Sequence, residues 1–187
     1  MPSSPLPVPL PIDLLTRNVG RYGPFGIPHG FERVRLNNYG VSFFSLAGNT
    51  NNIDNIAQYT RDGEIWGVNA DYLRQGEMGE HQLVLTLPIE DTLITELELF
   101  MEFIRDISKV PLPINVECGI EGVAGRQIVH NGYSIGRAPV MHRDVVQHKG
   151  VLRSFDVAEQ QALLMEFFKK MNENSGEPRP KGLYGRG

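Results

Sequence analysis

Two histidines, an aspartate and a glutamate in the second half of this 187-residue chain have side chains that could move protons. His142 and Asp144 are two residues apart, and His130 and Glu121 come shortly before them. Imidazole and carboxylate groups are the usual general acids and bases of hydrolytic enzymes. If neighbouring hairpins bring these four residues together, the chain carries a hydrolase or nuclease site.

No recognised catalytic spacing supports these four residues. His142-Arg143-Asp144 is similar to the kinase catalytic loop, but that loop needs an asparagine where this chain has Lys149. The sequence contains no His-Glu-x-x-His and no phosphate-binding glycine loop. We therefore predict no metal and no cofactor, and we expect a non-catalytic protein.

Two glutamates and the single cysteine lie on the alternating segment 114–121, which we expect to be a strand. Glu117 and Glu121 would share one face about 13 Å apart, which is too far for a glycosidase pair of about 5–9.5 Å. Cys118 would lie on the opposite, apolar face. A thiol in that position is expected to be buried and inert.

One amphipathic helix and that strand form the predicted centre of the fold. Leucine, phenylalanine and isoleucine recur every three or four residues over 91–110, which predicts a helix with one apolar stripe. Pro111 and Pro113 separate this helix from the strand at 114–121. The order of segments favours an α+β fold, a mostly antiparallel sheet with two main helices packed on one face.

The remaining segments give the expected domain boundaries. Residues 1–30 form a proline-rich arm and loop, residues 31–176 a single α+β domain, and residues 177–187 a flexible basic tail. Turn signals at Asp62-Gly63 and Asn131-Gly132 predict two hairpins.

We expect short strands before and after Asn37-Asn38-Tyr39-Gly40, and another at 81–87. A further turn is expected at His148-Lys149-Gly150. Asp156, with Glu159 three residues later, predicts the start of the last helix.

Charge changes sign in the middle of the chain. Residues 88–121 carry eight acids and two bases, and residues 122–155 carry five bases and one acid. An acidic segment beside a basic one favours self-association, such as a homodimer, or a protein partner. The basic residues could instead contact phosphates of a nucleic acid. They are Arg126, Arg137, Arg143, Lys149 and Arg153.

Composition points to a cytoplasmic protein without a membrane partner. No apolar run of 18 or more residues exists, so no transmembrane helix is expected. A single cysteine excludes an internal disulfide and fits a reducing compartment.

A decapeptide in the first half, with a later tetrapeptide, resembles a known region. The decapeptide is Tyr59-Thr60-Arg61-Asp62-Gly63-Glu64-Ile65-Trp66-Gly67-Val68, and Ile120-Glu121-Gly122-Val123 follows the long helix. This pattern resembles the region downstream of the Schlafen/AlbA-like DNA-binding domain in some bacterial proteins. The resemblance implies an accessory or sensing domain beside a nucleic-acid-linked domain, and it carries over no catalytic residue.

Three functions follow as hypotheses. The first is a non-catalytic accessory, sensing or protein-interaction module of a bacterial cytoplasmic system, acting by association. The second is a hydrolase or nuclease with a site at Glu121, His130, His142 and Asp144. The third is nucleic-acid binding through the basic segment 122–155.

Overall fold

A computed structural model describes residues 9–17, 33–46, 52–75, 77–78, 81–130 and 137–180. Residues 1–8 of the arm and the Asn131-Gly132 turn lie outside this range. The α+β class is confirmed, because a four-stranded antiparallel sheet is combined with helices. The chain divides into two compact units, unit 1 (residues 1–71 and 95–114) and unit 2 (residues 72–94 and 115–187). The single domain over 31–176 stays a prediction, and each unit is described by itself.

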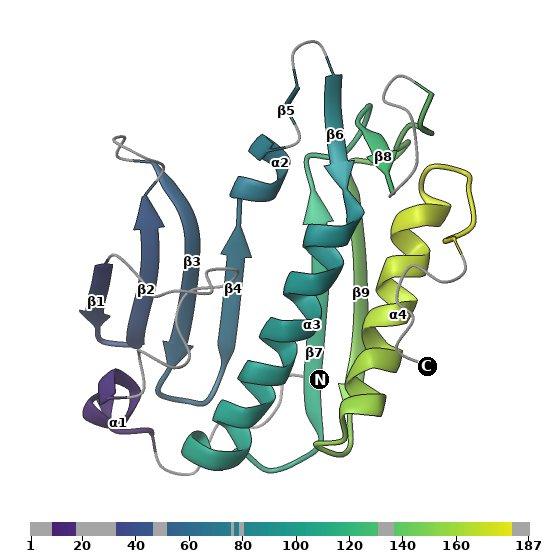
Figure 1. Ribbon diagram of the computed structural model, residues 1–187. Helices are drawn as coiled ribbons and strands as arrows, with labels where there is room; N and C mark the ends of the chain where they lie inside the picture. Colours follow the sequence, from purple (N-terminus) through teal and green to yellow (C-terminus); the bar gives the residue numbers. More distant parts are fainter. Residues whose placement is uncertain are drawn as a thin grey trace. The chain divides into compact units, whose positions relative to one another are not determined.

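Unit 1 contains an antiparallel meander of four strands (Figure 1). The strands are β1 (Arg33–Asn37), β2 (Gly40–Leu46), β3 (Ile53–Thr60) and β4 (Ile65–Asn69), paired in chain order. The Asp62-Gly63 hairpin is therefore confirmed as the β3–β4 connection. Gly40 has a specific role at the β1–β2 turn, because a Cβ on it would lie 2.0 Å from the Tyr59 carbonyl oxygen.

An aromatic cluster forms the core of unit 1. Tyr59 is fully buried, and its ring meets those of Phe43, Phe100 and Phe103 in edge-to-face contacts at centroid distances of 4.9–6.1 Å. Helix α1 (Ile12–Arg17) adds Leu15 to the same cluster. Such pairs stabilise a core beyond the area they bury, by about 0.5–1.5 kcal/mol each.

The long helix begins earlier than the apolar stripe predicts. Helix α3 (Thr86–Phe103) starts five residues before Asp91 and continues as a π-helical turn, η1 (Ile104–Ser108). Pro88 lies in the first turn, where no intrahelical partner is needed for its missing N–H, so it does not interrupt the helix. Lys109, in the left-handed conformation (φ 55°), ends the helix before Pro111.

Unit 2 contains the other strands. Short β5 (Glu77–Met78) pairs with β6 (His81–Leu85), and β6 pairs in parallel with β8 (Gln127–Val129). Strand β7 (Ile114–Glu121) has the predicted bounds and alternates between half-buried and exposed residues. It forms a two-stranded sheet with β9 (Val145–Leu152). Helix α2 (Asp71–Gln75) connects β4 to β5.

The predicted turn at His148-Lys149-Gly150 is wrong. Strand β9 runs through these residues without interruption. Gly150 has another role, because a Cβ there would lie 2.8 Å from the Leu163 side chain of α4 (Val157–Glu173). The glycine permits the helix to approach the strand closely.

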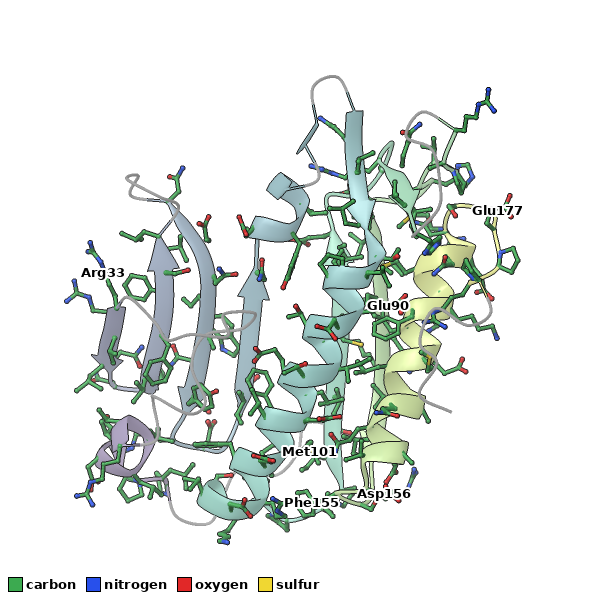
Figure 2. All side chains as sticks on the ribbon, in the orientation of Figure 1. Arg33, Glu90, Met101, Phe155, Asp156 and Glu177 are labelled. Atoms are coloured by element: carbon green, nitrogen blue, oxygen red, sulfur yellow. The ribbon has the colours of Figure 1, made fainter. Side chains whose placement is uncertain are left out.

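The start of α4 is as predicted. The Asp156 carboxylate accepts a hydrogen bond from the Ala158 amide at 3.0 Å. Glu159 reaches back to Ser154 and to the Arg153 amide, and these hydrogen bonds lower the pKa of Glu159. Asp156 and Glu177 lie beyond opposite ends of the helix (Figure 2).

No helix among the described residues is long and apolar enough to cross a membrane.

Phe103→Ala is expected to reduce the free energy of unfolding by about 3–5 kcal/mol, because it leaves a cavity against Tyr59. Urea denaturation followed by far-UV circular dichroism measures this loss. Leu36→Ala is the control, because Leu36 is 59% exposed and should change stability by about 0.5 kcal/mol or less. Equal losses for the two variants would contradict this description of the core.

Candidate functional site

The outer face of the sheet in unit 1 carries a row of polar side chains that ends on an aromatic one. Side chains alternate along a strand, so Val41, Phe43, Ala57 and Tyr59 point to the core and their neighbours point away. The pairing places one residue of each strand in a row on this second face: Arg35, Ser42, Gln58 and Trp66. Trp66 is thus the direct cross-strand neighbour of Gln58.

Gln58 is buried, but the nitrogen of its side-chain amide has no hydrogen-bond partner among the described residues. The side chain is 93% buried, and its Oε1 accepts a hydrogen bond from the Ser42 hydroxyl. The Asn37 amide donates to the same hydroxyl at 3.4 Å. Gln58 Nε2 has no hydrogen-bond partner among the described residues. Leaving a buried donor unpaired costs about 1–3 kcal/mol.

This nitrogen differs from the other buried polar atoms that lack a partner in the described part of the chain. Those atoms are Asn55 Oδ1, His148 Nδ1, Gln160 Oε1 and Asn172 Oδ1. Gln58 Nε2 is the only amide nitrogen in this group, and an amide nitrogen can only donate. Gln58 is also the only member of the group whose residue lines the pocket described next.

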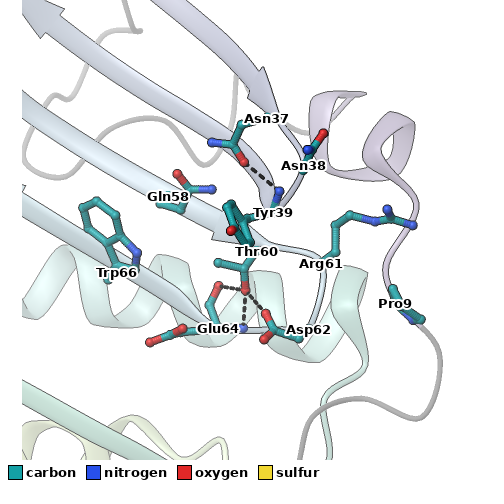
Figure 3. Close-up of a pocket in the computed structure, with 10 residues that line it drawn as sticks. All are labelled: Pro9, Asn37, Asn38, Tyr39, Gln58, Thr60, Arg61, Asp62, Glu64 and Trp66. Carbon is teal, nitrogen blue, oxygen red and sulfur yellow. Dashed lines mark hydrogen bonds between the residues drawn. The ribbon is translucent and has the colours of Figure 1, made fainter.

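A pocket of about 530 Å³ lies at this end of the sheet (Figure 3). Its volume is in the range of small-molecule sites, about 300–1,000 Å³. The described residues that line it come from the arm, the β1–β2 turn and the β3–β4 hairpin: Pro9, Asn37, Asn38, Tyr39, Gln58, Thr60, Arg61, Asp62, Glu64 and Trp66. Gln58 lies between Trp66 and Thr60 in the close-up.

Hydrogen bonds fix both turns at the pocket. Thr60 Oγ1 accepts from the Glu64 amide at 2.9 Å and also contacts the Asp62 carboxylate. Asn37 Oδ1 accepts from the amides of Tyr39 and Gly40, each at 2.9 Å. The pocket wall is therefore formed by two turns whose backbones are held by side chains.

The end of the proline-rich arm is attached to the same hairpin. The Leu10 amide donates to the Arg61 carbonyl at 2.6 Å, and Arg61 Nε donates to the Leu10 carbonyl at 3.2 Å. Leu10 is buried in the core of unit 1. These contacts position Pro9 at the pocket.

The four predicted catalytic residues lie in unit 2 in unlike environments. His130 is 95% buried, and its Nδ1 lies 2.8 Å from the Thr86 hydroxyl. Burial lowers the pKa of His130, and the Asn172 side chain partly opposes this shift. Glu121, His142 and Asp144 are exposed. Asp144 accepts a hydrogen bond from the Ala124 amide at 3.3 Å.

Neither a metal site nor an activated thiol is found among the described residues. No group of three His, Cys, Asp or Glu side chains within them could hold a metal ion. Burial raises the pKa of Cys118 to about 12, and the neighbouring Glu117 contributes to the shift. A thiol with this pKa stays protonated near neutral pH and is a poor nucleophile.

Two of the five basic candidates are engaged within the protein. Arg126 donates to the carbonyls of Gly122 and Leu73, each at 2.9 Å, and Lys149 pairs with Glu117 at 2.8 Å. The side chains of the other three, which are Arg137, Arg143 and Arg153, are exposed and make no hydrogen bond or ion pair within the described residues. Three separate arginines form a small electrostatic surface for a nucleic acid.

Unit 2 also contains a buried ion pair that the sequence did not reveal. Glu90 is fully buried and accepts two hydrogen bonds from Arg179, at 2.7 and 3.3 Å. Burial raises the pKa of Glu90, and the Arg179 charge and hydrogen bonds oppose that shift. We expected a flexible tail from residue 177, yet Arg179 is paired here and lies 6.0 Å from the centre of the Phe168 ring.

The chain matches no family model, no curated protein and no solved structure. The resemblance to the Schlafen/AlbA-associated region stays a prediction.

Glu90→Ala is expected to reduce the free energy of unfolding by about 3–5 kcal/mol, because it leaves the Arg179 guanidinium largely buried without its counter-charge. Chemical denaturation measures the loss. Glu117→Ala breaks the exposed pair with Lys149 and should cost about 1 kcal/mol or less. Similar small losses for both variants would show that the Glu90–Arg179 pair is not buried in solution.

Stability is expected to fall on acidification because His130 resists protonation in the folded state. Its folded pKa lies below the unfolded value of about 6.5, so the unfolded chain binds more protons as the pH falls through that value. His130→Gln should therefore reduce the loss of stability between about pH 7 and pH 5. Denaturation midpoints across this range measure the slope. Glu90, whose pKa is raised, contributes the opposite slope in both proteins.

His142→Gln is the control for the removal of one histidine from an exposed position. A slope unchanged in His130→Gln would contradict the buried, neutral histidine.

Proposed function

We propose that this chain is a non-catalytic sensing module that binds a small ligand in the pocket of unit 1 and acts by association. The observation that carries the proposal is Gln58, which lines the pocket and whose buried amide nitrogen has no hydrogen-bond partner among the described residues. A ligand that supplies a hydrogen-bond acceptor there would recover the cost of burying this donor.

Trp66 supports the same proposal. Its indole is 41% exposed beside Gln58, so a large apolar surface and an unused donor adjoin each other on one face. Pockets that bind small molecules combine apolar or aromatic walls with a few fixed polar groups. The turns at Asn37 and Thr60 are held by hydrogen bonds before any ligand binds, which reduces the ordering cost of binding.

The enzyme hypothesis has less support. A general acid or base needs access to its substrate, and His130 is buried against Thr86. The three exposed candidates, Glu121, His142 and Asp144, are not part of any metal-binding group within the described residues. Nucleic-acid binding has less support as well, because Arg126 is bound to backbone carbonyls.

The proposed setting is a bacterial cytoplasm, where the module would serve a larger system through a protein partner or a second copy of itself. The single, half-buried cysteine, Cys118, fits a reducing compartment. The motif 59–68, which carries the resemblance to the Schlafen/AlbA-associated region, forms the β3–β4 hairpin of the pocket. In this proposal the pocket is the sensing element and ligand binding changes the association.

The proposal is tested with the chain's own tryptophan. Trp66 is the single tryptophan, so selective excitation reports on the pocket alone. Neutral sugars, nucleosides, quaternary amines and amino acids would each be titrated, with melting temperature as a second measurement. At least one class should shift the emission and raise the melting temperature, since ligand at about one hundred times its Kd adds about 2.7 kcal/mol.

Gln58→Leu should weaken this response because it deletes the amide. Gln147→Leu is the matched control, because Gln147 is an exposed strand residue of unit 2. Circular dichroism would show that both variants are folded. The proposal fails if none of the four classes changes the emission, or if both variants respond like the parent protein.

A further inference from the structure

We propose that the ligand of this pocket is a neutral carbohydrate, whose ring stacks on Trp66 and accepts a hydrogen bond from Gln58 Nε2. This inference rests on the proposed function and specifies its ligand class. It uses the hydrogen-bonding character of the lining residues, their charge and the shape of the aromatic wall.

The hydrogen-bonding groups of the pocket require a ligand that both donates and accepts. Gln58 Nε2 can only donate, so a ligand that pairs with it must present an acceptor. The carboxylates of Asp62 and Glu64 can only accept, so the ligand must present donors there. A hydroxyl group does both, and a sugar carries several hydroxyls around one ring.

The aromatic lining fits the apolar side of a sugar ring. Trp66 lies in the same cross-strand row as Gln58, so a ring that lies on the indole has its edge next to the amide. Tyr39 adds a second aromatic side chain that is 78% exposed. The C–H groups on one side of a pyranose are apolar and would cover the indole without requiring a charged partner.

The charges favour a neutral ligand over a phosphorylated one. The described lining contains two carboxylates, Asp62 and Glu64, and one guanidinium, Arg61. Arg61 Nε already donates to the Leu10 carbonyl. Two acids would repel a phosphate, which disfavours nucleotides, nucleic acids and sugar phosphates.

The hairpin itself fixes the Asp62 carboxylate and the backbone of Glu64. The Thr60 hydroxyl contacts Asp62 and accepts from the Glu64 amide, as the dashed lines of Figure 3 show. Acceptors held in place by a turn match a ligand whose hydroxyls are fixed by a ring. Both partners then lose little conformational freedom on binding.

Isothermal titration calorimetry with the full chain tests the assignment. The probes are glucose, galactose, mannose, maltose and cellobiose, with glucose 6-phosphate, adenosine and choline as comparisons. At least one neutral sugar should bind and should shift the Trp66 emission. Gln58→Leu should weaken that binding about tenfold, the effect of losing one well-placed hydrogen bond, and Gln147→Leu should not.

Glu64→Gln gives an independent test of the charge argument. Glucose 6-phosphate should bind more weakly than glucose to the parent protein, and this difference should shrink in the variant because one repelling charge is removed. Glu64 is exposed, and its backbone rather than its carboxylate makes the hydrogen bonds to Thr60, so the variant should fold normally.

The remaining outcomes separate the two proposals. Binding of adenosine or choline that depends on Gln58, without sugar binding, would overturn the carbohydrate assignment and leave the binding module intact. Tighter binding of glucose 6-phosphate than of glucose would also overturn it. If none of these probes binds and none of the four ligand classes changes the Trp66 emission, both proposals fail.

Discussion

The register of β3 is the constraint on which unit 1 depends. Tyr59 and Gln58 are adjacent in sequence, and strand alternation sends one side chain to the core and the other to the pocket. A slip by one residue would exchange them, placing an amide among Phe43 and Phe103 and a phenol ring on the outer face. The core and the candidate site are therefore two consequences of one pairing.

Local features at the Thr60 end of β3 hold this register. Gly40 lets β2 approach the Tyr59 carbonyl, where any Cβ would collide. The Thr60 hydroxyl closes the β3–β4 turn, and Asn37 closes the β1–β2 turn. Each of these residues lies at or next to the pocket, so the interactions that set the strand pairing also form the pocket wall.

Unit 2 differs from unit 1, because several of its polar side chains form hydrogen bonds or ion pairs with one another. Glu90 is bound by Arg179, His130 meets Thr86, and Glu117 pairs with Lys149. A group whose hydrogen bonds stabilise the fold has less freedom to exchange protons with a substrate. This explains why His130, one of the residues that first suggested chemistry, gives little support to an active site.

Structural features that depend on neighbouring residues in the sequence were predicted correctly. The bounds of β7, the Asp62-Gly63 hairpin and the Asp156 cap are set by neighbouring residues, and all three were predictable. Gly150 was not predictable in this way, because a glycine that admits Leu163 is indistinguishable in sequence from one in a turn.

The candidate site could not be predicted in the same way. Gln58 meets Ser42 and Trp66 only through strand pairing, and Glu90 meets Arg179 across 89 positions. One of these contacts, between Gln58 and Trp66, could have been predicted from the Asp62-Gly63 turn. With the β3–β4 register derived from the turn, the pairing of Gln58 with Trp66 follows. That Gln58 Nε2 has no partner does not follow, because it depends on the whole surrounding packing.

In the proposed site, Trp66 would supply affinity and Gln58 would supply specificity. An exposed indole attracts any ligand with a flat apolar side, so Trp66 alone would discriminate weakly. A buried donor discriminates strongly, because a ligand without an acceptor leaves it unpaired, and sites built on such donors reject the wrong ligand by large factors. In the proposed site, Gln58 would therefore decide which of the ligands attracted by Trp66 remain bound. The cost of keeping that donor unpaired in the free protein would then be the physical origin of the selectivity.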